Sequence, residues 1–377
     1  MINNTMGFKK LITNSLINLP GWHTNRKIVV IESDDWGSIR MPSKEVYDYL
    51  INKGIRADLN PYCRYDSLAT PTDLESLFEV LQSVKDKHGK PAVLTANTLV
   101  ANPDFDKIKA SDFTEYHFEL FTETLKRYKQ TEKSFDLWQE GMQADVFHPQ
   151  FHGREHLNIK KWLKDLREGV DITRLAFELN TFGLTSETDP NINKDYMGAF
   201  NSGLQEDIAE YKEIIIEGLD LFERLFNFRS LSFIPTTYTW PPAIEPVLLQ
   251  QGVKYLQGAP FQRIPLDDDT TFRFKKNNFT GRKSKAGLTY ITRNAYFEPS
   301  QLPEINWEKD CMRRVSLAFS MKKPAVIGVH RLNFIGAIAE SNRNKNLHVL
   351  KNLLQGIVKK YPEIEFMSTD RLGNIIR

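Results

Sequence analysis

The stretch VVIESDDWGS, residues 29 to 38, decides how the rest of the chain is interpreted. Its apolar, β-branched beginning is typical of a buried strand. The run then ends in three carboxylates, Glu32, Asp34 and Asp35, and a turn-forming Gly37. Carboxylates this close repel one another, and burial makes the repulsion worse. The stretch therefore indicates either a strand that ends in a solvated turn or a strand that delivers carboxylates to a metal ion.

Working outward, strand-like runs recur along the chain and alternate with helix-like segments. The runs cover residues 27–33, 91–100, 144–152, 231–240, 253–261, 287–297, 324–334 and 364–370. Segment 70–89 is typical of the helices between them, because Leu74, Leu77, Leu81 and Val84 share one face. This alternation predicts an α/β fold with a parallel sheet, and about eight strands favour a barrel over an open sheet. No glycine-rich phosphate loop follows the first strand, which weighs against a dinucleotide-binding fold.

Composition narrows the class of protein. The 377 residues are 41% hydrophobic and 26% charged, with a formal net charge of +2, as in an ordinary globular protein without a nucleic-acid partner. Two distant cysteines form neither a disulfide framework nor a cysteine metal site. No apolar run is long enough to span a membrane, and the N-terminus makes a poor signal peptide, so we expect a cytoplasmic protein. The oligomeric state stays open.

We expect one domain over residues 1–377. Residues 1–26 form an N-terminal extension with a short amphipathic helix, and segments of about 101–140 and 181–204 are insertions. In a parallel barrel, polar residues at the carboxyl ends of strands mark the active site. Such ends carry Asp34, Asp35, Asn97, His148, His152, His156, Tyr238, Arg293, Asn294 and His330.

Three of the eight histidines fall within nine residues, in FHPQFHGREHLN (147–158). His148 and His152 share one face of a strand. His152 would end the strand and His156 would lie in the turn into the next helix, so that both imidazoles point at one place. His148 would support the ligands from deeper in the barrel, or replace His156 as a ligand. The alternative is a polar rim of ordinary hydrogen-bonded histidines.

These residues together resemble the polysaccharide deacetylases, a family of carbohydrate esterases with a distorted (β/α) barrel of about seven to eight strands. The resemblance is carried by Asp34-Asp35 after the first strand, His152-x-x-x-His156 after the third and the late strand VIGVHR (326–331). It extends over residues 27 to 370. It implies a metal-dependent hydrolase that removes acetyl groups from an N- or O-acetylated sugar or polysaccharide.

Residue by residue, the resemblance implies that Asp34 is the general base and that His330 is the general acid. Asp35, His152 and His156 would hold a divalent ion, with zinc the first choice. Backbone amides near Tyr238 would help to hold an oxyanion. Both aspartates can reach the site only if the strand turns there, and Gly37 makes such a turn possible.

The sequence departs from the family at two motifs. The third motif lacks its arginine, and Arg293 could replace it from a neighbouring strand. The fourth, acidic motif has no clear match, and Glu298 is the candidate for it. Asn97 and Asn294 are further candidates for support or substrate binding, although Arg293 and Asn294 could simply tie down a loop. Trp36 and Trp240, with Tyr238, either stack on a sugar or pack in the core.

Three rival functions use the same residues. A glycosidase needs carboxylates about 5–10 Å apart across a bond, which adjacent aspartates serve poorly. A two-histidine, one-carboxylate iron oxygenase matches the ligands but not the β/α alternation. An inactive carbohydrate-binding protein on the same scaffold would explain the missing arginine.

Overall fold

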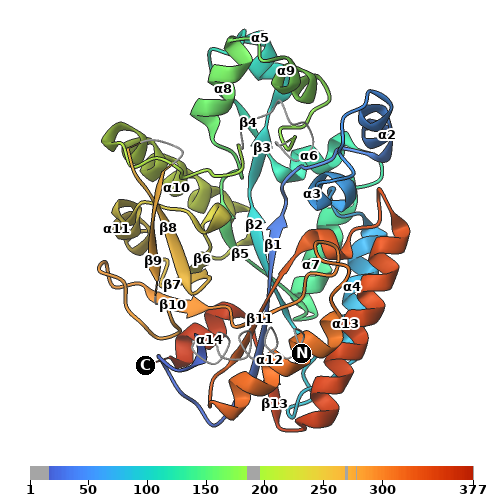
Figure 1. Ribbon diagram of the computed structural model, residues 1–377, viewed down its shortest axis with the longest axis vertical. Coiled ribbons are helices and arrows are strands. Elements are labelled where there is room, and N and C mark those ends of the chain that lie inside the picture. The colour runs from blue at the N-terminus through green and yellow to red at the C-terminus, as the bar shows by residue number, and fades with distance from the viewer. Residues whose placement is uncertain (1–16, 185–195, 268–270, 277, 377) are drawn as a thin grey trace, which may run out of the picture.

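The computed structural model describes residues 17–184, 196–267, 271–276 and 278–376 (Figure 1). Residues 1–16 of the predicted N-terminal extension lie outside the described residues, and so does most of its predicted short amphipathic helix. Residues 185–195 of the second predicted insertion also lie outside them. No helix in the described part of the chain is both long enough and apolar enough to cross a membrane.

One parallel sheet organises the fold, and within the described residues it has nine strands. Eight follow one another in the order β10-β7-β6-β5-β2-β1-β12-β11, and β13 pairs with the start of β1. The bounds are β1 (Lys27–Trp36), β2 (Leu94–Leu99), β5 (Phe147–Gly153), β6 (Ser232–Phe233), β7 (Tyr255–Gly258), β10 (Thr289–Thr292), β11 (Ala295–Tyr296), β12 (Ala325–His330) and β13 (Ile364–Phe366).

The sheet curls so far that a short segment of chain joins the strands at its two ends, β10 and β11. β10 pairs with β7 and β11 pairs with β12, and only Arg293 and Asn294 separate them. The Arg293 amide donates to Gly258 of β7, whereas the Asn294 amide donates to Val326 of β12. The predicted distorted (β/α) barrel of parallel strands is thereby confirmed.

Asn294 is a structural residue of this closure. Its side-chain oxygen accepts from the amide of Val326, and its amide group donates to Pro324 O and to Asn18. These bonds occupy the side chain within the joint between β10, β11 and β12. The expectation that Asn294 supports the active site or the substrate is therefore wrong, and its alternative, tying down a loop, describes the side chain.

Helices pack around the sheet (Figure 1). Their bounds are α2 (Lys44–Asn52), α3 (Pro61–Tyr65), α4 (Pro71–Gln82), α5 (Phe105–Ala110), α6 (Phe121–Arg127), α7 (Ser134–Gln143), α8 (Ile159–Arg167), α9 (Asp171–Glu178), α10 (Gln205–Phe226), α11 (Glu245–Gln250), α12 (Trp307–Ser320), α13 (Glu340–Lys360) and α14 (Thr369–Ile375), with short 3₁₀ turns η1 (Thr236–Tyr238), η2 (Pro242–Ile244) and η3 (Arg331–Phe334).

Helix α4 shows how local sequence fixes these elements. Thr70 and Asp73 form a reciprocal capping box at its start, and Pro71 takes the first turn, where its missing N–H costs nothing. Leu74, Leu77 and Leu81 are fully buried in the main core. Their burial on one face holds the helix against the sheet.

The first predicted insertion begins directly after the carboxyl end of β2. Within 101–140 the chain forms the antiparallel pair β3 (Ala101–Pro103) and β4 (Phe118–Leu120), followed by α6 and α7. Helices α5, α8 and α9 share a second, smaller core that includes Ile108, Trp162 and Phe177. A second antiparallel pair, β8 (Phe261–Pro265) and β9 (Phe272–Lys276), stands beside the sheet (Figure 1).

Candidate active site

The end of β1 turns at Asp35 itself. Asp35 has a φ of 74°, and the pairing of β1 with β2 skips between Ser33 and Trp36. A left-handed backbone is costly for a residue with a side chain, and such strain collects at functional sites. The bulge breaks the strict alternation of side chains, so Asp34 and Asp35 both line one cavity. The expected turn is present, but it begins two residues before Gly37, which also has a positive φ of 85°.

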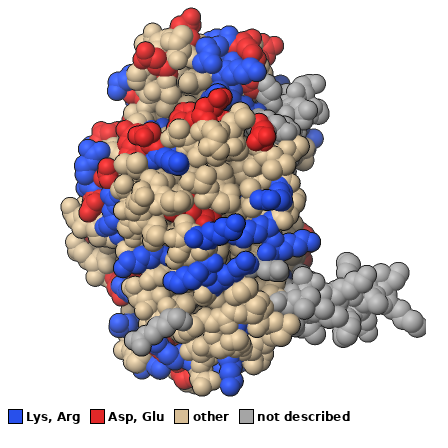
Figure 2. All heavy atoms as spheres, turned by 90° about the vertical axis from the view of Figure 1, so that its left-hand side faces the viewer, with Lys and Arg blue, Asp and Glu red and all other residues tan. Residues whose placement is uncertain are grey.

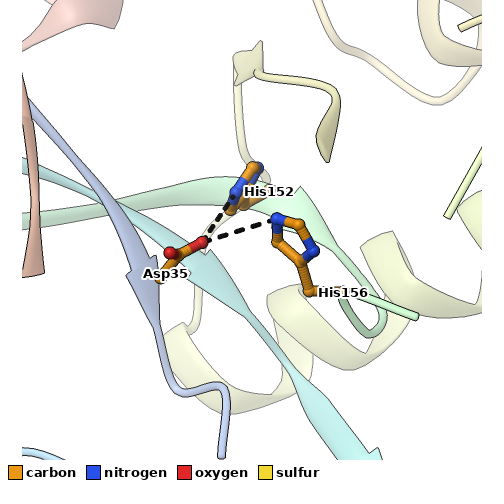
Figure 3. Close-up of side chains that lie close together, drawn as sticks. All are labelled: Asp35, His152 and His156. Atoms are coloured by element: carbon orange, nitrogen blue, oxygen red, sulfur yellow. Dashed lines mark ion pairs between the residues drawn. The ribbon is translucent and has the colours of Figure 1, made fainter. Parts of the chain in front are cut away.

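Asp35, His152 and His156 converge from three elements (Figure 3). The Asp35 Oδ1 atom lies 3.5 Å from His152 Nε2 and 3.6 Å from His156 Nε2. All three side chains are buried, and their candidate ligand atoms lie within 4.8 Å of one another. His152 is on β5, and His156 follows in the loop that leads to α8. The Asn158 side chain caps that helix by accepting from the Lys161 amide.

The hydrogen bonds around this triad leave its inner atoms free for an ion. His152 Nδ1 donates to the Ile234 carbonyl at 2.7 Å, which turns Nε2 toward Asp35. This buried Nε2 atom has no hydrogen-bond partner among the described residues. Atoms that share an ion at about 2.0–2.2 Å lie roughly 3–4 Å from each other, as Asp35 Oδ1 does from each of the two imidazole nitrogens. Two imidazoles and one carboxylate fit a divalent first-row metal.

Electrostatics favour the ligand forms of these side chains. Burial opposes ionisation of Asp35, but Arg40, His152 and His156 together hold its pKa well below the ordinary value. Burial and the charge of Arg40 hold the pKa of His156 well below its ordinary value, which leaves a neutral imidazole. Arg40 Nη2 lies 3.3 Å from Asp35 Oδ2, the oxygen that does not face the histidines. The sequence analysis missed Arg40, because an isolated arginine after a turn carries no pattern.

Asp34 lies in a fork formed by Arg293. Arg293 Nη2 donates to Asp34 Oδ1 at 2.6 Å and Nη1 donates to Oδ2 at 2.7 Å, while Asn97 donates to Oδ1 at 2.8 Å. Burial opposes ionisation of Asp34, but the charge and hydrogen bonds of Arg293 lower its pKa below the ordinary value. The structure thus brings Arg293 and Asn97 to Asp34. The sequence had offered Arg293 as a replacement for the missing arginine and Asn97 as a candidate for support or substrate binding.

Arg293 also reaches deeper into the barrel. Its Nε donates to Glu32 Oε2 at 2.7 Å, and its Nη1 donates to the Tyr238 hydroxyl at 3.0 Å. Its side chain crosses Gly328 of β12, where an added Cβ would lie 2.6 Å from Arg293 Cδ. Glu32, the first acidic residue of the stretch 29–38, is therefore a second carboxylate that Arg293 binds. It is not part of the cavity wall.

His330 faces Asp34 from the neighbouring strand. The two residues are partners in the β1–β12 register, and His330 Nε2 lies 3.7 Å from Asp34 Oδ2. His330 Nδ1 donates to Glu298 Oε1 at 2.6 Å. Burial opposes protonation, but the charge and hydrogen bond of Glu298 raise the pKa of His330 to about 9. Asn333 and Gln301 donate to the other oxygen of Glu298 and fix it in place.

A cavity of about 790 Å³ opens onto these groups. Its wall includes both aspartates, both triad histidines and His330, together with Tyr62, Tyr238 and Arg263. The Tyr62 ring meets the His330 ring edge to face at 5.5 Å, a contact that the sequence analysis missed. Tyr238 lines the cavity with its side chain, but its amide donates to Pro235 O within the η1 turn. The Tyr238 amide is therefore occupied within the turn, and an oxyanion contact from other backbone amides near Tyr238 stays a prediction.

His148 does not support the triad. Its Nε2 lies 3.2 Å from Asp370 Oδ1 at the start of α14, and its ring stacks on Phe228. Four residues of strand place its Cα about 13 Å from that of His152, at the opposite end of the barrel. The shared face was predicted correctly, but the distance along the strand makes support of the ligands wrong.

The two tryptophans proposed for sugar stacking are core residues. Trp36 is 1% exposed, meets the rings of Phe147 and Trp138 edge to face, and donates to Ser33. Trp240 is also 1% exposed and donates to Glu245. Neither ring lines the cavity, so the packing alternative holds for both.

Comparison with known proteins gives fold likenesses only. No family model matches the chain, and no curated protein matches its sequence. A 4-alpha-glucanotransferase from Thermococcus litoralis is similar in structure, with 11% identity and a TM-score of 0.46 over 93% of this chain, which spans only 40% of that protein. PuuE allantoinase has 11% identity and a TM-score of 0.46 over 95% of this chain and 93% of its own. A family 4 carbohydrate esterase from Streptomyces lividans, in complex with acetate, has 9% identity and a TM-score of 0.36 over 90% of this chain and 91% of its own. At these scores the likenesses carry no argument about activity.

Proposed function

We propose that this protein is a metal-dependent hydrolase that removes acetyl groups from an acetylated carbohydrate. The observation that carries the proposal is the position of Asp34 and His330 beside the Asp35-His152-His156 triad, with each side chain held by a partner outside the triad. Asp34 is held by Arg293, and His330 is held by Glu298. Deacetylation is the activity implied by the resemblance in sequence motifs.

The triad supplies the place for a divalent ion. Asp35 Oδ1, His152 Nε2 and His156 Nε2 would hold it, and Arg40 would keep the second oxygen of Asp35 turned away. Such an ion polarises an acyl carbonyl and lowers the pKa of water. The buried donors and the shielded position suit a site that binds an ion permanently.

In this proposal Asp34 accepts a proton from the attacking water. Arg293 and Asn97 fix the carboxylate and keep it ionised, so that it is ready as a base at neutral pH. The fork of Arg293 also fixes the orientation of both oxygens. In this proposal Arg293 is a positioning residue that acts through Asp34.

In this proposal His330 donates a proton to the departing amine or alcohol. Glu298 occupies Nδ1, so the Nε2 proton faces the cavity and Asp34. An imidazolium in this position gives up its proton as the acyl bond breaks, which makes the sugar a better leaving group. Acid and base assistance of this kind each contribute about 10²–10⁴ in rate.

The test is acetate release from a panel of N- and O-acetylated glycans, with and without a chelator. We expect release from at least one glycan, loss of release on chelation, and recovery when the metal is restored. Asp34→Asn should abolish turnover, whereas Asp370→Asn, a carboxylate at the other end of the barrel, should retain it. No release from any acetylated glycan would contradict the proposal and favour an inactive carbohydrate-binding protein.

A further inference from the structure

The β8–β9 pair presents an exposed face of alternating aromatic rings and cations. Phe261 lies opposite Lys276 and Arg263 lies opposite Phe274 in the antiparallel register, so all four side chains share one face. Phe261 is 38% exposed and Phe274 is 58% exposed, which is unusual for rings this large. Arg263 and Lys276 are exposed as well. We call these four residues the hairpin face.

The hairpin face continues the wall of the active-site cavity. Arg263 lines that cavity, and the Phe261 ring meets the Tyr238 ring at a centroid distance of 6.2 Å. Tyr238 in turn accepts a hydrogen bond from Arg293, the partner of Asp34. An unbroken line of side chains therefore leads from the aspartate out to the surface.

Positive charge gathers around this face. Residues 261–290 contain seven basic residues and three acidic ones. The acidic ones are Asp267, Asp268 and Asp269, which are consecutive in the sequence. Figure 2 shows Lys and Arg side chains in a band across this side of the molecule.

Among the described residues, the cations of the hairpin face have no acidic partner. In the described part of the chain no carboxylate pairs with the side chain of Arg263 or Lys276. Burial lowers the pKa of the neighbouring Lys275, against the charge of Glu245 and with a smaller contribution from the charges of Arg282 and Lys285. Cations kept apart from acids beside a cavity attract anions to it.

We propose that the substrate is an anionic polysaccharide, in which sugar residues that carry carboxylates bind along the hairpin face while an acetylated residue occupies the cavity. Exposed rings suit the apolar faces of sugars, and arginine and lysine suit their carboxylates. A neutral glycan would use the rings but not the cations. This inference rests on the proposed function for the identity of the reaction, but not for the binding.

The test uses two forms of one polymer. Partially O-acetylated polygalacturonate carries a carboxylate on each sugar, and methyl esterification removes that charge without changing the sugar. Affinity for each form is measured with the full chain by calorimetry, and KM and kcat are measured by acetate release. The variant is the double substitution Arg263→Gln and Lys276→Gln. The matched control, Lys109→Gln and Lys126→Gln, removes two exposed cations elsewhere on the surface.

We expect wild type to bind the charged polymer about tenfold more tightly than its ester, as two exposed ion pairs would provide. The double substitution should remove this preference and raise KM with little change in kcat, and the control should retain wild-type values. Restoring charge with Arg263→Lys and Lys276→Arg should recover most of the preference.

Two outcomes separate this inference from the proposed function. Equal affinity for the polymer and its ester, with acetate released from both, would overturn the inference and leave the hydrolase standing. Preferential binding without any acetate release would support the face and contradict the hydrolase. Binding of duplex DNA as tight as that of the charged polymer would show an unspecific polyanion surface and would also overturn the inference.

Discussion

Arg293 reaches Asp34 across the neighbouring strand β12, and it does so from the segment that closes the sheet. The two residues are 259 positions apart in the chain, yet two hydrogen bonds of 2.6 and 2.7 Å join them. Arg293 occupies this position because its neighbours pair with β7 on one side and β12 on the other. Closure of the barrel and orientation of the proposed base therefore depend on the same two or three residues.

Arg293→Lys should lower kcat by about 10²-fold, because lysine keeps the charge but loses the planar fork that aligns both oxygens of Asp34. KM and metal content should change little, because Arg293 does not contact the triad. Steady-state kinetics and metal analysis measure all three quantities. Wild-type kcat in this variant would show that the fork has no catalytic purpose.

Gly328→Ala should act on the same contact without changing any residue of the cavity. The new methyl group would overlap Arg293 Cδ and push the guanidinium away from Asp34. We expect kcat to fall, as in Arg293→Lys. Thermal melting measures whether the variant is folded. A folded variant with full turnover would contradict this account of the packing.

The triad should hold about one divalent ion per chain. Asp35→Ala and His152→Ala should each lose the ion, because three ligands are the minimum for firm binding. His148→Gln, at the opposite end of the barrel, is the matched control and should retain it. Elemental analysis of the purified proteins measures the content, and full occupancy in both alanine variants would rule out this set of ligands.

Glu298→Gln should weaken proton donation by His330, since the carboxylate that holds Nδ1 and raises the pKa is lost. The effect on kcat should be largest for substrates with poor leaving groups, which need the proton most. A series of aryl and alkyl acetates separates these cases. An equal loss for good and poor leaving groups would argue against His330 as the acid.

Glu365 should make stability depend on acid pH. Hydrogen bonds from Arg26, opposed by burial and helped by Lys87, lower its pKa from 4.5 to about 2. A pKa that is lower in the folded state stabilises the fold above pH 4.5, and this contribution is lost as the pH falls toward 2. Glu365→Gln should therefore lower the unfolding free energy by up to about 1 kcal/mol at pH 7, since both partners are partly exposed.

Chemical denaturation between pH 7 and pH 3 measures that difference. The gap between wild type and Glu365→Gln should narrow as the pH falls. Glu363→Gln removes an exposed carboxylate two residues away and should show no such gap. A gap that stays constant with pH would mean that the ion pairs of Glu365 add nothing to stability.

Local sequence patterns were enough to predict the strands and the barrel, and to single out polar residues that line one cavity. Runs of β-branched residues and leucines on one face of a helix indicate which side chains are buried. Parallel strands place their carboxyl ends together. The errors have a common origin, because a local pattern does not show which distant segments pack against a residue. His148 was assigned to the right face but the wrong depth, and Trp36 and Trp240 were given a possible surface role although packing buries them.

By itself, the sequence was enough to single out residues that the fold brings to one cavity: a pair of aspartates at a strand end, two histidines four residues apart and a late histidine. Only the tertiary structure decided how they are held. Arg293, Arg40 and Glu298 act on partners that are distant in the chain or separated by a turn, and such contacts depend on register and on how the sheet closes. The hairpin face has the same origin, because its rings and cations come together only when β8 pairs with β9. Patterns along a chain record burial and alternation, whereas the pairing of side chains across strands is set by the fold as a whole.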